Sequence, residues 1–240
     1  PWNFPVAIAA GGVLSALAAG ASVIIKPAPQ VVNCGIAMVE TLWRAGVPKE
    51  NLQVALVPDN ELGLQLVGHQ DVDSVILTGA FETAKLFKNY RARTRLFAET
   101  SGKNGIIISP FADLDLAAND LAKSAFGHAG QKCSAASLGI LIGSVYSNEQ
   151  FLKQLVDCVE SMKVGYGSQA DATVGPLIET PSPKLLRALT QLDAGEKWLL
   201  EPKQLDDSGR LWRPGIKIGV KPNSFFHQTE VFGPVLGLIK

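Results

Sequence analysis

Apolar residues along the chain follow two alternating patterns, helical spacing and short continuous runs. Residues 31–45 give the clearest helical spacing, with Val32, Ile36, Val39 and Leu42 recurring every three or four positions. Short apolar or β-branched runs separate segments of this kind and predict strands. The predicted helices span residues 6–19, 31–45, 61–68, 82–90, 113–126 and 184–192, with one more that ends at Met162. The predicted strands span residues 22–25, 52–57, 74–77, 96–98, 105–108 and 138–142.

This alternation determines the predicted fold class. Near-continuous apolar strands separated by helices are typical of a parallel sheet that helices cover on both faces. We therefore expect an α/β protein with three αβα layers, and a less regular region over residues 165–215. In such sheets ligands bind beyond the carboxyl ends of the strands, so Lys26, Thr78 and Glu99 are the first candidates for a site.

An uncharged stretch near the start of the chain raises the question of a membrane span, and a second stretch predicts where a helix begins. The 21 uncharged residues from Pro5 to Ile25 are formally long enough to cross a bilayer. They are mostly alanine and glycine, which contribute little transfer free energy, so we expect a buried helix with small side chains that stops at Gly20 and no membrane partner. Ser147 and Gln150 match a capping box and predict Ser147 as the N-cap of the helix that ends at Met162.

Composition and charge narrow the function classes. The 240 residues, 47% of them hydrophobic, are enough for one or two folded domains. Lys and Arg total 22, as do Asp and Glu, so no global field favours a nucleic acid or an acidic membrane surface. Three widely spaced cysteines predict neither a disulfide framework nor a metal site and fit a reducing, cytoplasmic setting. Cys34 and Cys158 lie in amphipathic helices, where core packing is the expectation.

Cys133 is the candidate nucleophile among the cysteines. It follows a glycine-bearing loop in which Gln131, Lys132 and backbone N–H groups can favour the reactive thiolate. A buried, unreactive cysteine explains the same pattern equally well. His128 lies five positions earlier, and this spacing gives no geometric support to a Cys/His hydrolase.

Two other residues also have a functional and a structural explanation. Glu99 follows an apolar run and precedes a turn-forming Thr-Ser-Gly sequence. A carboxylate in a semi-apolar pocket can act as a general base toward water, but a solvated loop glutamate is the simpler reading of this pattern alone. Asn3 lies between Trp2 and Phe4, where its amide N–H groups can stabilise an oxyanion or simply form a turn. The turn at residues 57–63 lacks the glycine-rich dinucleotide fingerprint.

Six short motifs, taken together, resemble those of the aldehyde dehydrogenase superfamily in order and over nearly the whole chain. The motifs are Pro-Trp-Asn-Phe-Pro at 1–5, Lys-Pro-Ala at 26–28, Leu-Thr-Gly at 77–79, Glu-Thr-Ser-Gly-Lys-Asn at 99–104, Gly-Gln-Lys-Cys at 130–133 and Thr-Glu-Val-Phe-Gly-Pro-Val at 229–235. The resemblance implies an aldehyde-dehydrogenase-like fold, incomplete at both ends. It also implies a partial NAD(P)-binding, Rossmann-like domain over residues 1–100 and a partial catalytic domain over residues 101–240.

The resemblance assigns roles to individual residues. Cys133 would attack the aldehyde carbon, Asn3 and the Cys133 backbone N–H would hold the oxyanion, and Glu99 would activate the water that hydrolyses the thioester. The implied cofactor is NAD, with NADP as the alternative. The residues that would bind it are Lys26, Trp2, Thr78, Gly79, Thr100, Glu230 and Phe232. Phe4 and Ser134 would contact the aldehyde.

Within the superfamily, residues 126–137 and 227–230 look most like 1-pyrroline-5-carboxylate dehydrogenases, including the aldehyde-oxidising part of bifunctional proline-utilisation enzymes. The implied reaction converts L-glutamate γ-semialdehyde to L-glutamate, in a homo-oligomeric parent protein that in some relatives is fused to a proline dehydrogenase. Pro29 and Ala80 depart from the family pattern on the adenosine side, which leaves the adenosine-side affinity and the choice between NAD and NADP open. Leu138 follows the nucleophile loop where similar proteins often have arginine.

The family segments expected before the first motif and after the last one are not in the sequence, so we expect a piece of a longer protein. Two other functions therefore stay open: a truncated fragment that acts as a binding or structural unit, and a thiol esterase that needs no cofactor.

Overall fold

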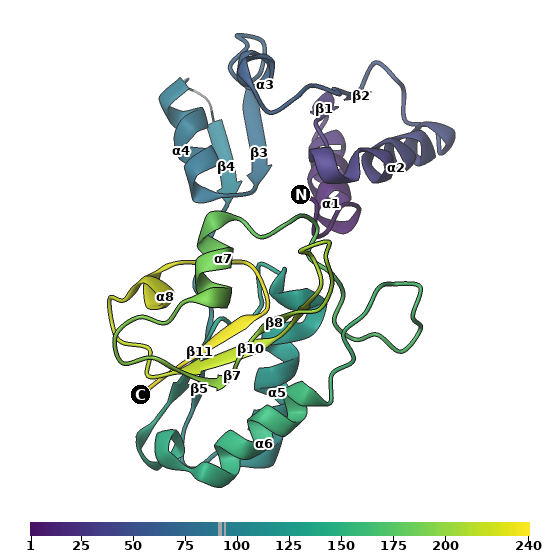
Figure 1. Ribbon diagram of the computed structural model, residues 1–240. Helices are drawn as coiled ribbons and strands as arrows, with labels where there is room; N and C mark the ends of the chain where they lie inside the picture. The colour runs from purple at the N-terminus through teal and green to yellow at the C-terminus, as the bar shows by residue number, and fades with distance from the viewer. Residues whose placement is uncertain (91–92, 94) are drawn as a thin grey trace. The chain divides into compact units, whose positions relative to one another are not determined.

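The computed structural model describes residues 1–90, 93 and 95–240, which form two compact units, Pro1–Ser101 and Gly102–Lys240 (Figure 1). The first unit holds α1 (Ala7–Ala18), β1 (Val23–Ile25), α2 (Val32–Arg44), β2 (Leu52–Val54), α3 (Glu61–Val67), β3 (Ser74–Thr78), α4 (Phe81–Tyr90) and β4 (Arg95–Glu99). The second holds β5 (Gly105–Ile108), α5 (Leu114–Phe126), β6 (Leu138–Leu141), α6 (Glu149–Glu160), α7 (Pro183–Thr190), β7 (Lys197–Leu200), β8 (Lys203–Gln204), β9 (Trp212–Arg213), β10 (Gly215–Ile218), α8 (Phe225–Gln228) and β11 (Val235–Ile239).

A small apolar core joins α1, α2 and the parallel β1–β2 pair of the first unit. Its buried side chains are Val13, Met38, Val39 and Leu52. The indole N–H of Trp43 donates to the carbonyl of Leu52 at 2.9 Å, which attaches the end of α2 to β2. Because β1 and β2 are parallel, their carboxyl ends and the residues that follow them lie at the same end of the strand pair.

The other strand pair of this unit, β3 and β4, is also parallel. Its register sets Thr78 opposite Glu99, and the backbone N–H of Gly79 donates to the carbonyl of Glu99 at 3.1 Å. Ser101 follows and accepts a hydrogen bond from the backbone N–H of Phe81 at the start of α4. Two predicted strand-end candidates, Thr78 and Glu99, therefore lie side by side at one edge.

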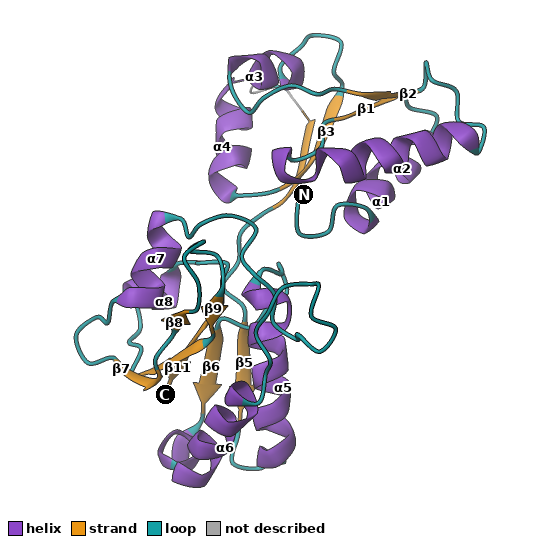
Figure 2. Cartoon of the chain, turned by 45° about the vertical axis from the view of Figure 1, so that its right-hand side comes forward, coloured by secondary structure: helices purple, strands orange, loops and turns teal. Residues whose placement is uncertain are grey.

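The second unit is built on one five-stranded sheet in the order β5-β6-β11-β10-β7. The first four strands are parallel neighbours, and β7 joins β10 in the antiparallel direction at the edge. Figure 2 shows α5 and α6 on one side of this sheet and α7 and α8 on the other. The predicted α/β class with a parallel-dominated sheet is confirmed.

Alternate residues of β11 explain the three layers. Leu236 and Leu238 join the apolar cluster under α5 and α6, which includes Phe126 and Phe151. Val235 and Ile239 point the other way and join the cluster under α7 and α8. Because successive side chains of a strand face opposite sides, one apolar run supplies both cores.

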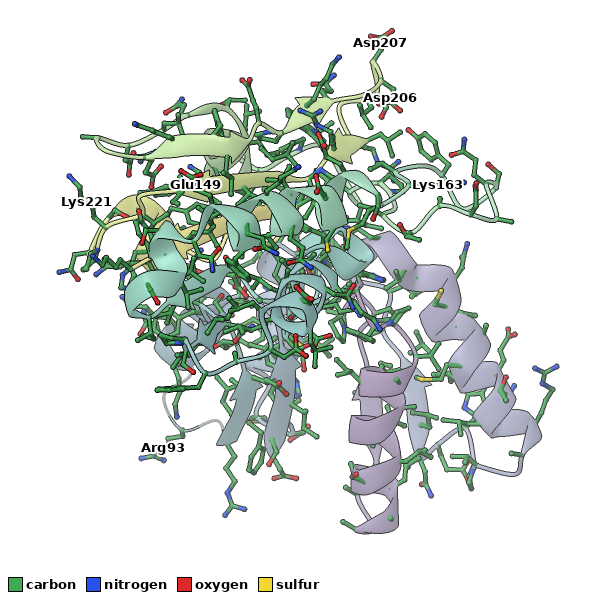
Figure 3. The ribbon with its side chains drawn as sticks, turned by 90° about the horizontal axis from the view of Figure 1, so that it is seen from below. Arg93, Glu149, Lys163, Asp206, Asp207 and Lys221 are labelled. Carbon is green, nitrogen blue, oxygen red and sulfur yellow. The ribbon has the colours of Figure 1, made fainter. Side chains whose placement is uncertain are left out.

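Loops between α6 and β10 form the irregular region that the glycines and prolines predict. Tyr166 Oη donates to Asp206 Oδ2 at 2.5 Å, and Ser208 Oγ donates to Asp206 Oδ1 at 2.6 Å. These hydrogen bonds, from Ser208 first and Tyr166 second, lower the pKa of Asp206. Figure 3 labels Asp206 and Asp207 in the loop after β8. It also labels Lys163, which begins the loop that follows α6.

Several expectations about the elements are wrong. The N-cap of α6 is Asn148, whose side chain accepts from the backbone N–H of Phe151 at 3.0 Å, whereas Ser147 Oγ donates to the carbonyl of Ser144. Asn148 is the cap because its extended backbone directly precedes the first helical residue, Glu149, whereas Ser147 belongs to the preceding 3-10 turn. Three strands of the five-stranded sheet, β7, β10 and β11, are not among the predicted strands.

Burial also differs from expectation. Helix α1 buries only Val13, and Cys34 is exposed because α2 turns Gly35, Met38 and Val39 inward. Phe97, in a strand expected to be buried, is 62% exposed, since the β3–β4 pair has no further strand beside it among the described residues. Cys158 is half-buried and packs against the α5–α6 core, as expected. None of the helices in the described part of the chain has both the length and the apolar character to span a bilayer.

Candidate active site

Cys133 lies on the loop between α5 and β6 and is exposed, although Ala129, Gly130 and Gln131 of the same loop are buried. The chain leaves α5 at Phe126 and then takes the left-handed conformation at His128, Ala129 and Gly130, with φ of 60°, 55° and 68°. Such strained backbone in residues other than glycine persists only where its surroundings impose it, and it is concentrated at functional sites. The loop therefore presents the thiol to solvent rather than sealing it in the core.

Both the backbone conformation and the close packing at position 130 require a glycine there. Its φ of +68° disfavours any side chain, and an added Cβ would lie 2.3 Å from the carbonyl oxygen of Gly233. Gly233 belongs to the segment that carries Glu230 and Phe232. The nucleophile loop and this segment, about a hundred positions apart in sequence, thus meet backbone to backbone in the same unit.

Two amide side chains hold the loop. Gln131 is only 5% exposed; its Nε2 donates to the carbonyl of Pro176 at 3.2 Å, and its Oε1 accepts from the N–H of Ile178 at 3.0 Å. Asn104 Nδ2 donates to the carbonyl of Cys133 at 2.6 Å and to that of Ala135 at 3.1 Å. The main chain on both sides of the thiol is therefore fixed while the thiol itself stays accessible.

Two hollows adjoin this loop. The first brings together the loop and the segment with the predicted nicotinamide-ribose residues; it is lined by Gly102, Asn104, Gly130, Lys132, Ala135, Ala136, Ser137, Glu230, Phe232, Gly233 and Val235. Phe232 has φ of 57° and is, after His128 and Ala129, the third residue other than glycine with a left-handed backbone in these two segments. The other hollow contains the predicted substrate residue Ser134 and is lined by Ile106, Asp120, Lys123, Ser124, Lys132, Ser134 and Ala135.

His128 is also in this loop. Burial, with Lys132 as the smaller cause, lowers the pKa of the His128 imidazole and so favours its neutral form. Lys103 has a larger shift: burial lowers its pKa to about 7, against the opposing attraction of Glu230.

The first unit holds the remaining predicted residues. Lys26 follows β1 and forms an ion pair with Asp59, which follows β2. Glu99 is exposed at the end of β4, and Thr100 is half-buried beside it. Trp2, Asn3 and Phe4 are half-buried ahead of α1, and Gly79 is exposed after β3.

The structure thus brings the predicted residues together in two groups. Within residues 1–101 it pairs Thr78 and Gly79 with Glu99, and within residues 102–240 it joins the Cys133 loop to the segment with Glu230 and Phe232. Asn3 and Glu99 belong to one unit and Cys133 to the other. Their convergence on one aldehyde therefore stays a prediction.

Sequence reasoning assigned no role to Asn104, Lys103 or Asp59. Asn104 and Lys103 stand in the motif with Glu99, so their place in the motif is a signal, but their partners lie 29 or more positions away. Asp59 lies in a turn-forming Pro-Asp-Asn sequence, which gives no indication of its partner Lys26.

The second unit thus has an α/β fold in which a tightly braced loop leaves the Cys133 thiol exposed. The chain belongs to the aldehyde dehydrogenase family, whose model matches residues 1–240. It is 33% identical to 1-pyrroline-5-carboxylate dehydrogenase of Geobacillus sp. (strain WCH70), over 100% of this chain and 48% of that protein. The chain spans about half the length of the curated relatives it matches.

Two solved structures are also similar. Proline Utilization A (PutA) from Corynebacterium freiburgense has a TM-score of 0.96 and 51% identity, over 100% of this chain and 24% of that one. The Thermus 1-pyrroline-5-carboxylate dehydrogenase with bound NAD has a TM-score of 0.88 and 32% identity, over 100% of this chain and 48% of that one.

Proposed function

We propose that the protein containing this chain is an NAD(P)-dependent aldehyde dehydrogenase that oxidises L-glutamate γ-semialdehyde to L-glutamate. Residues 1–100 would serve coenzyme binding, and residues 101–240 would carry the nucleophile. One observation supports this most strongly: the exposed thiol of Cys133 lies on a loop that Asn104 and Gln131 hold rigid, against the segment that carries Glu230.

The first step is attack of the Cys133 thiolate on the aldehyde carbon, which forms a C–S bond and places negative charge on the carbonyl oxygen. Because Asn104 fixes the carbonyl of Cys133, the main chain at the nucleophile is preorganised, and its N–H is a suitable donor to that oxygen. The amide of Asn3 is the second donor that we propose. A donor already in place needs no reorganisation when the charge develops.

The second step is hydrolysis of the thioester that oxidation leaves on Cys133. Glu99 would take a proton from water as the water oxygen attacks the thioester carbon. The C–S bond then breaks, the thiolate of Cys133 leaves, and the carboxylic acid is released. The exposed position of Glu99 at the end of β4 supports this role, since a general base toward water needs access to water.

The residues at the predicted coenzyme positions fit NAD or NADP chemically. The ammonium of Lys26 can donate to the hydroxyl oxygens of one ribose, and the carboxylate of Glu230 can accept from the hydroxyls of the other. The nicotinamide, when bound, accepts the hydride of the aldehyde carbon. Phe232 would pack near the second ribose; the other proposed contacts are Trp2, Thr78, Gly79 and Thr100.

The substrate proposal rests on similarity to proteins named 1-pyrroline-5-carboxylate dehydrogenase and on the second hollow, which is lined in part by Lys132 and Ser134, the sequence neighbours of Cys133. Lys123 and Lys132 supply two cations there and Ser134 a hydroxyl, which suit a substrate carboxylate, while Asp120 suits an ammonium group. Phe4 would contact the aliphatic part. The similarity to Proline Utilization A supports the further proposal that the full-length protein carries a proline dehydrogenase on the same chain. We also propose that the full-length protein is a homo-oligomer.

The test uses the full-length gene product and follows NADH formation with L-glutamate γ-semialdehyde. We expect Cys133→Ser to lower turnover by about a thousandfold or more, because a serine hydroxyl without an adjacent base is a poor nucleophile. Cys34→Ser is the matched control, at a second exposed thiol, and should turn over like the wild type.

Glu99→Gln tests the second step separately. We expect a rapid burst of NADH roughly equal to the enzyme concentration, followed by a steady rate reduced about a hundredfold, since only thioester hydrolysis needs the base. Retained turnover in Cys133→Ser would contradict the proposal. Ester hydrolysis without any binding of NAD or NADP would instead support the cofactor-independent thiol esterase.

A further inference from the structure

Lys103 connects two segments of the second unit that are far apart in the sequence. Its Nζ donates to Ser137 Oγ at 2.7 Å and to the carbonyl of Thr229 at 2.9 Å. The same ammonium lies 3.9 Å from the centre of the Phe226 ring. Two acceptors and a ring face satisfy the three N–H groups of an ammonium, so the side chain is fully committed to these contacts.

Each partner of Lys103 adjoins a part of the candidate site. Ser137 is the last residue of the Cys133 loop before β6, and its backbone N–H donates to the carbonyl of Asn104. Thr229 directly precedes Glu230. With Asn104 already bonded to the carbonyl of Cys133, two consecutive residues hold the loop and one of them also holds the Glu230 segment.

We propose that Lys103 is a positioning residue that couples the Cys133 loop to the segment carrying Glu230, so that the thiol and the ribose-binding carboxylate keep a fixed relation. This role goes beyond the proposed function, on which its consequence for coenzyme binding rests. Lys103 does not touch the reacting atoms; it acts through Ser137 and Thr229.

The neighbouring lysine indicates that Lys103 does more than fill the core. Lys217 lies on the same Phe226 ring, at 4.8 Å, but it has its own counter-ion, with Nζ 3.1 Å from Glu196 Oε2. Among the residues that the structure describes, no carboxylate lies within 4 Å of Lys103. Its N–H groups are bonded to the two segments that it joins, so those segments are the ones that respond when the N–H donors are removed.

The first test measures coupling without coenzyme. Lys103→Met keeps a long unbranched side chain and removes the ammonium; Lys153→Met, at an exposed lysine of α6, is the matched control. In the full-length gene product, amide hydrogen exchange is measured for residues 133–137 and 229–232. We expect exchange to rise about fivefold in both segments in Lys103→Met and in neither in the control. A rise in one segment only, in neither, or equally throughout the unit would overturn the inference.

A pH profile provides a readout that simple loss of packing does not change. The charged groups that act on Lys103 are Glu230, Glu196 and Lys217, and burial lowers the Lys103 pKa to about 7. Burial disfavours the ammonium, and the neutral amine keeps two N–H donors for Ser137 and Thr229. The arrangement in which Lys103 holds both segments therefore gains stability as the pH rises past about 7. Protection of the two segments, corrected for intrinsic exchange, should therefore rise together in the wild type and stay flat in Lys103→Met. Protection in the wild type that does not change with pH would contradict this.

Coenzyme binding separates this inference from the proposed function. We expect Lys103→Met to raise the Kd and KM for NAD about tenfold and to leave the KM for the aldehyde unchanged, because it loosens Glu230. Wild-type protein that shows the exchange coupling but binds no NAD or NADP would support the role of Lys103 and contradict the proposed function. Unchanged NAD affinity in Lys103→Met, with normal wild-type activity, would overturn the coenzyme effect of Lys103 alone.

Discussion

Replacing Gly130 with alanine tests the close approach on which the candidate site depends. The new Cβ would lie 2.3 Å from the carbonyl oxygen of Gly233, 2.7 Å from its carbonyl carbon and 3.1 Å from the carbonyl oxygen of Ala125. All of these atoms are backbone, so no side-chain rotation relieves the overlap. The left-handed conformation, φ +68°, adds its own penalty for a residue with a Cβ.

The loss of stability is the sum of two costs, one for the left-handed backbone and one for the overlap of the new Cβ with backbone atoms. A non-glycine residue in the left-handed region costs about 1–2 kcal/mol, and overpacking against a fixed wall costs about 1–3 kcal/mol, so the variant should lose about 2–5 kcal/mol of stability. At roughly 2–4 °C per kcal/mol, the unfolding midpoint should fall by at least about 4 °C. Differential scanning calorimetry of the full-length gene product, with NAD binding measured in parallel, reports the effect.

Gly127→Ala is the control, three positions earlier in the same loop. Gly127 has φ of −53°, and an added Cβ would meet only Lys132 Nζ, at 3.9 Å, which is ordinary contact. Its midpoint should stay within about 2 °C of the wild type, since alanine is compatible with that backbone. Equal midpoints for Gly130→Ala and Gly127→Ala would refute the close approach of the Cys133 loop to Gly233.

Two further predictions concern buried charges in the second unit. Lys217→Met should lower stability by about 3–5 kcal/mol in urea unfolding, because Glu196, with a side chain only 2% exposed, would keep a charge without its partner; adding Glu196→Gln should restore part of the loss, and no recovery would contradict the pairing. The pKa of Lys103 is about 7 in the folded chain against 10.5 for an ordinary lysine, so the unfolded chain binds more protons between these values. Stability should therefore rise with pH from about 7 toward 10.5, and urea unfolding at two pH values should show a smaller rise in Lys103→Met; equal rises would contradict the shift.

Local patterns predict most strands of the parallel sheets but not the strands that complete the larger one. The run Gly215–Ile218 contains Lys217, whose charge argues against a buried strand until Glu196, 21 positions earlier, is seen to neutralise it. Residues 235–239 form an apolar run like the others, but Val235 also ends the motif at 229–235, and the strand that begins there is not among the predicted strands. A buried charge and its partner are a tertiary feature, and periodicity contains no information about it.

The candidate site also has a part that local sequence predicts and a part that it does not. The motifs single out Cys133 as the candidate nucleophile and Glu230 as a candidate coenzyme-binding residue, and the exposed thiol agrees with a reactive cysteine rather than a buried one. They do not identify which groups hold the loop, because the hydrogen bonds of Gln131 span 45 and 47 positions. Cys34 illustrates the opposite error: helical spacing places it near the apolar stripe of α2, but it lies one position off the face that Gly35 and Val39 bury.

The motif at residues 99–104 crosses from the first unit into the second, and this limits where the proposed base can lie. Glu99 is in the first unit, while Asn104, in the second, donates to the carbonyl of Cys133 at 2.6 Å. Five peptide steps of at most about 3.6 Å keep the Cα atoms of Glu99 and Asn104 within about 18 Å of each other, whatever the arrangement of the two units. Since the same short segment also contains Lys103, one stretch of chain links the proposed base, the nucleophile loop and the Glu230 segment. Inserting glycines between Ser101 and Gly102 should therefore slow thioester hydrolysis while leaving the NADH burst, and an unchanged steady rate would show that this connection is not what places Glu99.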